Sequence, residues 1–268
     1  MGKFFLPLLL IIFLMIGCGG TQQNSDNLNS TKNEKPLVIG LDDEYAPFGF
    51  HNEKGELIGL DIDLAKEAAK RMGVKFEFTS IDWSKKEDEL YSGNIDIIWN
   101  GFDITPERKE KFLYSKPYMD NRQILLVKLG NESDFHSIYD LEGKIVGTQA
   151  GSTAETCING DENLKNSLAK FGTYRNVKEG FAALDSGEFD VLIIDELVGR
   201  YEMSKAQKKF KAVEITIGPV TEIGIGFRKS DTELRNKVQK VFDEMTKDGT
   251  TKKISERWFG ADLIKYKK

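Results

Sequence analysis

Short apolar runs alternate with amphipathic stretches along the chain from residue 36 onward. Residues 36–40 and 95–99 are apolar and rich in β-branched side chains, which is typical of buried strands. Between them, the apolar residues of 61–72 recur at the spacing of one helix face, with Asp61 as the expected N-cap and Gly73 as the end. Strands that alternate with helices predict an α/β fold with parallel strand pairs.

The same pattern starts again in the second half. Residues 124–127 are strand-like, but no helical stretch follows; a new opening strand comes at 144–147 instead. Ser186-Gly187 then leads into a strand at 191–194, as Ser92-Gly93 leads into the strand at 95–99, at an offset of 94 residues. The repeat suggests two similar lobes.

Two breaks in the pattern mark where the chain passes between the lobes. The first is Lys116-Pro117-Tyr118-Met119, and the second is Gly218-Pro219, after which a strand at 223–227 and two helices, 231–247 and 250–258, return to the first lobe. We therefore expect lobe 1 to comprise residues 36–118 and 222–268, and lobe 2 residues 119–221. Two crossings form a hinge, and hinged lobes close on ligands.

The N-terminal residues have the pattern of an exported protein. Residues 1–17 contain one lysine followed by an uncharged apolar run, which is short for a membrane span and predicts a secretory signal peptide. Met15-Ile16-Gly17-Cys18 resembles the lipobox of bacterial lipoproteins, so we expect Cys18 to be lipidated. The lipid would anchor the exported protein at the outer face of the cytoplasmic membrane; otherwise the protein would be periplasmic. An uncleaved anchor helix or a plain signal peptide is the alternative. Residues 18–35 are polar and predict a flexible tether.

Composition narrows the function further. The formal charge is −5, or −6 once Lys3 leaves with the signal peptide, and no basic arm is present, which argues against nucleic acid as a partner. A lipidated Cys18 leaves Cys157 without an intramolecular partner, so no disulfide is expected. His51 and His136 stand far apart without the spacing of a zinc site, and neither a metal nor a cofactor is expected.

Residues 100–108 carry the candidate chemistry. They follow a buried strand, and Thr105 can cap a helix that starts at Pro106. In open α/β sheets this end of a strand is where small ligands bind. Arg108 would stand in the first helical turn, where a cation works against the helix dipole, so either it holds an anionic group such as a carboxylate or it pairs on the surface with Glu107 or Glu110.

Several motifs in order give the chain a family resemblance. Five parts of the chain resemble the signatures of the extracellular solute-binding proteins of family 3. They are Gly59-Leu60-Asp61-Ile62-Asp63-Leu64-Ala65, residues 101–108, Ser115-Lys116-Pro117-Tyr118, residues 143–147 with 151–155, and Arg257-Trp258-Phe259-Gly260. The proteins of this family are the polar amino-acid-binding subunits of ABC importers. The resemblance implies a two-lobed, periplasmic-binding-protein-like fold of type II, with a cleft between the lobes, no catalysis and no cofactor, and permease subunits as partners of a monomer.

The resemblance also assigns roles. Arg108 would hold the α-carboxylate of an amino acid together with backbone N–H groups near Ser152 and Thr153, and Asp195 would hold the α-ammonium with the carbonyl of Gly101 and the side chain of Asp103. Asp195 could equally cap the following helix. Aromatic rings would flank the ligand's side chain, and Asp42 would meet its distal end. The full set of expected ligand-binding residues is Asp42, Tyr45, Trp83, Asn100, Gly101, Asp103, Arg108, Gln149, Ser152, Thr153 and Asp195.

The choice of amino acid rests on charge. Asp103 stands where Ser or Thr is frequent in the family, and Asp42, Asp43, Glu44 and Glu196 are candidates to make the cleft acidic, which favours arginine, lysine or ornithine. Glutamine and cystine remain alternatives. The same fold also serves a few exported dehydratases of prephenate or arogenate and the ectodomains of sensors, which are rival functions.

Overall fold

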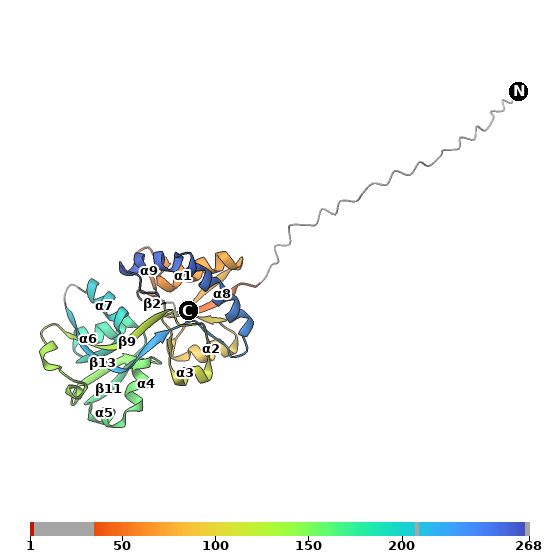
Figure 1. Ribbon diagram of the computed structural model, residues 1–268. Coiled ribbons are helices and arrows are strands. Elements are labelled where there is room, and N and C mark those ends of the chain that lie inside the picture. Colours follow the sequence, from red (N-terminus) through yellow and green to blue (C-terminus); the bar gives the residue numbers. More distant parts are fainter. Residues whose placement is uncertain (3–34, 207–208, 266–268) are drawn as a thin grey trace. The chain divides into compact units, whose positions relative to one another are not determined.

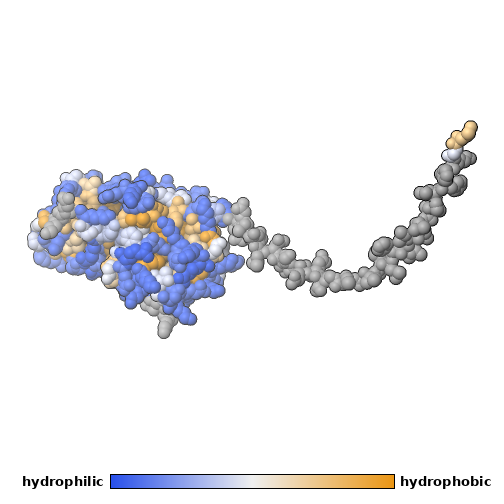
Figure 2. Space-filling model, turned by 90° about the horizontal axis from the view of Figure 1, so that it is seen from above, coloured by the Kyte–Doolittle hydropathy of each residue, from blue (hydrophilic) through white to orange (hydrophobic). Residues whose placement is uncertain are grey.

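The computed structural model describes residues 1–2, 35–206 and 209–265. Residues 3–17 of the predicted signal peptide, the lipidation site Cys18 and all but the last residue of the predicted tether lie outside the described residues. From residue 35 onward the chain forms one compact unit that contains two large sheets, each with its own helices (Figure 1), and a small sheet of three short strands. Hydrophilic residues dominate the face of this unit seen in Figure 2.

The first sheet has five strands in the order β5-β1-β6-β14-β8. β1 pairs in parallel with β5 on one side and β6 on the other, whereas β14 runs antiparallel to its neighbours. The predicted strand at 95–99 is short, because only Ile97 and Ile98 make ladder bonds. The bounds are β1 (Leu37–Leu41), β5 (Phe76–Ser80), β6 (Ile97–Ile98), β8 (Leu113–Tyr114) and β14 (Gly226–Phe227).

Of the described elements, four α-helices and one 3-10 turn belong with the first sheet. The helices α1, α8 and α9 pack against one another, and the apolar residues of α8 at positions 238, 241, 242 and 245 are buried, as the spacing predicted (Figure 1). The C-terminal helix is tied to α1 by the indole N–H of Trp258, which donates to Asp63 at 2.9 Å. The bounds are α1 (Leu60–Met72), η1 (Trp83–Lys85), α2 (Lys86–Ser92), α8 (Thr232–Lys247) and α9 (Thr250–Phe259).

The second sheet has six strands in the order β11-β10-β12-β9-β13-β7. β10 pairs in parallel with β11 and β12, so its centre repeats the arrangement of β5, β1 and β6 in the first sheet. No α-helix follows β9, as the pattern predicted; two 3-10 turns, η2 (Glu132–Asp134) and η3 (Ile138–Leu141), lead to β10 instead. The bounds are β7 (Asp103–Ile104), β9 (Met119–Lys128), β10 (Ile145–Gln149), β11 (Lys170–Tyr174), β12 (Val191–Asp195) and β13 (Phe210–Ile223).

Helices flank the second sheet, and a small hairpin sheet adjoins the first. The repeated Ser-Gly pairs close α2 and α6 in the same way: Gly93 and Gly187 follow them with φ of 82° and 85°, a left-handed conformation that glycine adopts without strain. Cys157 of α4 is half-buried and packs against Gly218. The bounds are α3 (Pro106–Lys111), α4 (Thr153–Gly160), α5 (Glu162–Ser167), α6 (Val177–Ser186), α7 (Glu196–Lys205), β2 (Glu44–Tyr45), β3 (Gly49–His51) and β4 (Leu57–Ile58).

Two paired strands carry the chain between the sheets. β9 and β13 are antiparallel, with Met119 opposite Ile223 where they leave the first sheet and Lys128 opposite Phe210 at the far end. The expected single strand at 223–227 is wrong, because β13 ends at Ile223 and β14 begins at Gly226 in the other sheet. The lobe boundaries at 118/119 and 221/222 stay a prediction.

The expected role of Asp61 as a helix cap is also wrong. Gly59 occupies the N-cap position of α1, and Asp61 lies inside the first turn with 1% of its surface exposed. Its carboxylate instead accepts a hydrogen bond from the N–H of Gly101 at 2.7 Å and from the Tyr118 hydroxyl at 2.8 Å. Asp61 therefore supports the start of the 101–108 segment.

Two features are absent from residues 1–2, 35–206 and 209–265. None of the helices in these ranges is long and apolar enough to cross a membrane. No group of three or more His, Cys, Asp and Glu side chains within the same ranges is placed to hold a metal ion.

Candidate functional site

The residues predicted to bind ligand gather where the two sheets meet. They follow the carboxyl ends of β1 and β6 in the first sheet and of β10 and β12 in the second, which is where α/β sheets bind small ligands. We call this region the junction. Its core consists of Asp42, Tyr45, Asn100, Asp103, Arg108, Gln149, Thr153 and Asp195, all buried.

Asp42 and Gln149 connect the two sheets directly. The Gln149 amide donates to the Asp42 carboxylate at 2.6 Å and to the carbonyl of Arg175 at 3.1 Å. The backbone N–H of Asp42 donates to the Asn100 side chain at 3.0 Å, which fixes the turn after β1 against the turn after β6. Burial raises the pKa of Asp42 to about 6, although its hydrogen bonds act in the opposite direction.

Tyr45 and Asp195 form a second connection. The Tyr45 hydroxyl donates to the Asp195 carboxylate, which also accepts from the side-chain amide of Gln123. Asp195 stands at the N-cap position of α7, yet its side chain makes no capping bond, so the alternative role as a helix cap is not used. Burial raises the pKa of Asp195 to about 6, and the nearby Asp103 carboxylate adds to the rise.

The Asp103 carboxylate is surrounded by donors. Pairing of β7 with β13 places it opposite Ile223, and one of its oxygens accepts from Asn121 at 2.9 Å and Thr221 at 2.8 Å. The other accepts from the Thr153 hydroxyl at 2.5 Å. The Asp103 carboxylate is thus well supplied with hydrogen-bond donors by the protein.

Arg108 and Lys86 converge on one carbonyl. α3 begins as predicted, with Thr105 as its N-cap accepting from the Arg108 N–H at 3.2 Å. The Arg108 guanidinium donates to the carbonyls of Asp103 at 3.3 Å and Gly151 at 3.0 Å, and Lys86 Nζ donates to the same Gly151 carbonyl at 2.8 Å. Burial, with the Arg108 charge second, lowers the pKa of Lys86 to about 7.

Two predicted residues lie beside this cationic end. The ring of Trp83 packs edge to face on the ring of Phe102, with their centroids 5.6 Å apart. The Arg108 guanidinium lies over the same Phe102 ring, 4.9 Å from its centroid. Ser152 is the N-cap of α4, with its hydroxyl accepting from the N–H of Glu155 at 3.1 Å. The positive end of the α4 dipole therefore faces the side of the junction that holds Arg108.

Four junction residues escaped the sequence reasoning. All four are buried: Asp61, Lys86, Gln123 and Tyr174. Their local sequence shows no sign of a binding role, because Asp61 stands at a helix start, Lys86 in a lysine-rich turn, and the other two in strands. Three polar atoms near the junction, Asn100 Nδ2, Gln123 Oε1 and the Tyr174 hydroxyl, are buried without a hydrogen-bond partner in the described ranges. Such atoms are rare in folded proteins, and they indicate that a bound ligand supplies the missing hydrogen bonds.

The other acids proposed for the cleft are neutralised or exposed. Glu44 pairs with Lys178 at 2.6 Å, a bond that links β2 of the hairpin sheet to α6. Glu196 accepts both 2.6 Å bonds from Arg122 and pairs with Arg200, and these guanidinium partners lower its pKa to about 2. Of the four acids, only Asp42 adds a buried carboxylate to the junction.

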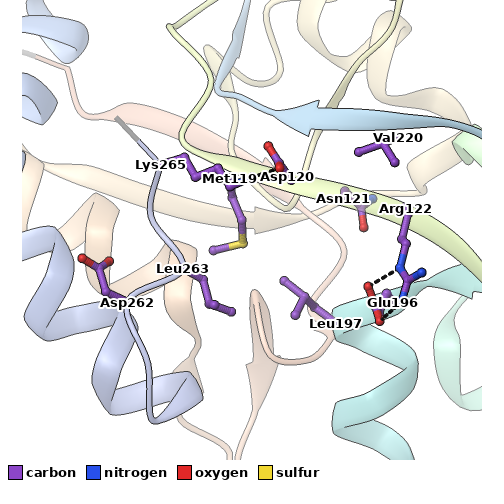
Figure 3. A pocket seen from close by; sticks show the side chains of 10 residues that line it. All are labelled: Met119, Asp120, Asn121, Arg122, Glu196, Leu197, Val220, Asp262, Leu263 and Lys265. Atoms are coloured by element: carbon purple, nitrogen blue, oxygen red, sulfur yellow. Dashed lines mark hydrogen bonds and ion pairs between the residues drawn. The ribbon is translucent and has the colours of Figure 1, made fainter. Parts of the chain in front are cut away.

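A cavity of about 370 Å³ lies beside the crossing strands (Figure 3). Four of its charged side chains are paired with one another, Arg122 with Glu196 and Lys265 with Asp120, and the Asp262 carboxylate accepts from the backbone N–H of Ile264. Met119, Leu197 and Leu263 supply an apolar surface between them. The cavity contains none of the predicted ligand-binding residues, and nothing in it calls for a charged ligand.

The chain is similar to known proteins along most of its length. Residues 37–261 match the bacterial extracellular solute-binding proteins, family 3. The L-cystine-binding protein TcyJ of Escherichia coli (strain K12) is 32% identical over 238 residues, which cover 89% of this chain and 88% of that protein. The arginine-binding extracellular protein ArtP of Bacillus subtilis (strain 168) is 30% identical, covering 93% of this chain and 94% of its own.

A solved structure extends the likeness to three dimensions. An ABC uptake transporter substrate-binding protein from Streptococcus pneumoniae with bound histidine superposes with a TM-score of 0.81 at 34% identity, covering 86% of this chain and 95% of that one. The expected two-lobed fold of type II is thereby confirmed.

Proposed function

The chain belongs to family 3 of the bacterial extracellular solute-binding proteins, and from this premise we propose that it captures a basic amino acid by closing two lobes around it. Membership makes it an amino-acid-binding component of an ABC importer that works outside the cytoplasm. It also makes the chain a binding protein and not a dehydratase.

Arg108 and the start of α4 are the proposed site for the α-carboxylate. A guanidinium presents two parallel donors that match a carboxylate, and the first N–H groups of a helix have no partner within the helix. Arg108 is held in place by its contact with Phe102 and by the Thr105 cap. In the bound state, its Nη2 donor would turn from the Gly151 carbonyl to the ligand.

Asp195 and Asp103 are the proposed partners of the α-ammonium. Both carboxylates are buried, and a buried ammonium is tolerated only when it is paired and hydrogen-bonded. Arg108 belongs to the segment between β6 and β8, whereas Asp195 ends β12 of the second sheet. Both ends of a zwitterion are therefore satisfied together only when the two sheets approach, so ligand binding favours closure.

The charge balance of the junction carries the choice of a basic side chain. Besides Asp61, whose carboxylate is taken up by Gly101 and Tyr118, three carboxylates are buried there, those of Asp42, Asp103 and Asp195. Arg108 and Lys86 lie together on the Gly151 carbonyl, and Arg108 also donates to the backbone carbonyl of Asp103. After the α-ammonium has taken its partners, Asp42 remains to receive a second cation, and that cation would hold its carboxylate ionised despite a pKa of about 6. Tyr45 and Trp83 are the proposed flanking aromatics.

Cystine and glutamine are the alternatives. A relative that is 32% identical is an L-cystine-binding protein, and the second ammonium of cystine could meet Asp42 as the side chain of arginine would. Glutamine would need Asp42 only as a hydrogen-bond acceptor.

Anchoring and delivery complete the proposal. The protein is proposed to be a monomer held at the membrane by a lipid on Cys18 and to deliver its amino acid to permease subunits, which read the closed form. The mass of protein extracted from membranes tests the anchor, because loss of residues 1–17 and a lipid on Cys18 change it by a known amount.

Calorimetry tests the binding function. Titration of the wild type with L-arginine, L-lysine, L-glutamine and L-cystine should give the tightest binding to one of the two basic amino acids. Arg108→Lys keeps the charge but loses the planar fork, and should weaken that binding at least about tenfold. Arg257→Lys, at an exposed arginine that contacts Asp63, is the matched control and should bind as the wild type does. Tight binding of a neutral amino acid alone would refute the basic choice, and no binding of any of the four would refute the function.

A further inference from the structure

Gln123 lies between the two carboxylates proposed to hold the ammonium. In the second sheet Asp195 of β12 is directly opposite Gln123 of β9, and side chains directly opposite each other in an antiparallel pair point to the same face. The Gln123 amide nitrogen donates to Asp195 and lies 3.5 Å from Asp103 Oδ2. Only 1% of the Gln123 surface is exposed.

A neutral amide suits this position better than a charged or apolar side chain. Two carboxylates that share a buried site repel each other, and a donor between them lowers that repulsion. A lysine or arginine here would cancel the negative charge that a cationic ligand needs. The glutamine amide satisfies both acids and leaves their charge available.

The other end of the same amide has no partner. Gln123 Oε1 is buried, and none of the residues that the structure describes donates a hydrogen bond to it. A buried acceptor left unpaired is costly, so a donor is expected. Because the neighbouring acids are negative, the donor that fits best is one that carries a positive charge.

We propose that Gln123 is a further ligand-binding residue, with Oε1 accepting a hydrogen bond from the α-ammonium while its amide nitrogen holds Asp195 and Asp103 in place. This inference rests on the proposed amino-acid-binding function and adds a third partner for the ammonium, located on a strand that crosses between the sheets. The other groups that face Asp195 are Tyr45 on β2, Asn121 on β9, Tyr174 on β11 and Asp103 on β7.

The test replaces Gln123 with methionine, which has a similar size but neither donor nor acceptor. The probe is whichever of L-arginine, L-lysine, L-glutamine and L-cystine the wild type binds most tightly. Gln123→Met should weaken its binding about 10- to 100-fold, the range for a lost hydrogen bond to a charged group. Gln239→Met is the matched control, because Gln239 is also buried and hydrogen-bonded but contacts Lys116 and Asp243 instead of the junction.

Two further readouts separate ligand contact from a merely structural role. The pH at which binding is half lost should rise in Gln123→Met, because Asp195 loses a donor that favours its ionised form. The same amino acid without its α-amino group should bind the wild type weakly, and Gln123→Met should weaken that binding little further.

The outcomes distinguish this inference from the function on which it rests. If the wild type binds one of the four amino acids and Gln123→Met binds it with the same affinity and pH profile, the Gln123 role is refuted alone. Equal losses of affinity in Gln123→Met and Gln239→Met would refute it too, by revealing a general loss of stability. If the wild type binds none of the four, the proposed function and this inference fail together.

Discussion

The side-chain amide of Gln149 lies 2.6 Å from the carboxylate of Asp42, although 107 residues separate them in the sequence. The bond joins the turn after β1 to the end of β10, and Tyr45 and Asp195 make a second bond of the same kind. Residues proposed to bind ligand thus also hold the two sheets together. The same side chains can therefore exchange partners between ligand and protein as the junction opens and closes.

Gly151→Ala should obstruct the approach of the two sheets. Gly151 has a φ of +75°, and an added Cβ would lie 2.7 Å from Ser84 Cα and 3.1 Å from the Trp83 carbonyl, both beside the first sheet. We expect amino-acid affinity, measured by calorimetry, to fall at least about tenfold, beyond the roughly 1–2 kcal/mol of stability that a strained φ costs.

A control isolates the collision from the backbone strain. Gly143 has a φ of +69°, and a Cβ there would meet nothing within 4 Å. Gly143→Ala should therefore lower the melting temperature by a similar amount and leave affinity unchanged. Equal affinities in the two variants would contradict the importance of this contact.

Tyr201→Ala should weaken the binding of every amino acid by the same factor. Its ring on α7 lies 5.5 Å from the ring of Phe50 on β3, and Lys205 Nζ lies 4.2 Å from the Tyr201 centroid, so the contact joins the two sides away from the proposed ligand residues. Loss of such a contact, about 0.5–1.5 kcal/mol, lowers the closed fraction and hence the apparent affinity about 2- to 10-fold. Calorimetry with two amino acids measures both factors. The exposed Tyr139→Ala serves as the control, and unequal factors for the two ligands would show that Tyr201 acts on specificity instead.

Stability and affinity should respond to pH in opposite directions. Burial raises the pKa of Asp42 and Asp195 to about 6 and of Asp61 to about 7, above the unfolded value near 4, so the folded state holds these protons more tightly. The free energy of unfolding of the ligand-free protein should therefore rise as the pH falls from 6.5 to 5. Glu196, with a pKa of about 2, loses its stabilising contribution only at lower pH.

Affinity for a basic amino acid should fall over the same pH range, because its cationic groups need Asp42 and Asp195 ionised. Thermal melting and calorimetry at pH 6.5, 5.75 and 5 measure the two trends. Asp42→Asn should flatten both. Parallel trends, or affinity that does not change, would argue against carboxylates as the partners of the ligand.

Asp61→Ala should lower the free energy of unfolding. The substitution leaves the Gly101 N–H and the Tyr118 hydroxyl without their acceptor in the core, which is worth about 2–4 kcal/mol of unfolding free energy for the two bonds. Denaturant unfolding measures the loss. Asp61→Asn keeps one acceptor oxygen and should recover part of it, whereas an Asp61→Ala protein as stable as the wild type would show that these bonds contribute little.

Local patterns in the sequence predicted most of the elements. The helix face of α8, the cap at Thr105 with Pro106 behind it, and the Ser-Gly ends of α2 and α6 each depend on residues a few positions apart. The restart of the α/β pattern was enough to expect two sheets. The split between β13 and β14 was missed because Gly224 and Ile225 continue the apolar run while the chain changes sheets.

Partners far apart in the sequence could not be predicted. Asp61 looked like a cap because acids are common at helix starts, and only the fold brings it to Gly101. Gln123 is one polar residue in a buried strand, and its meaning depends on the register that sets it opposite Asp195. Lys86 stands among charged residues in the sequence, and only the fold brings the Gly151 carbonyl beside it.

A crystal structure of the wild type with the amino acid that binds most tightly tests the central claim most directly. We expect the α-carboxylate on the Arg108 guanidinium and the start of α4, and the α-ammonium between Asp195 and Asp103, with a basic side chain directed to Asp42. An amino acid bound elsewhere, with Arg108 and Asp195 touching no part of it, would contradict the proposed clamp.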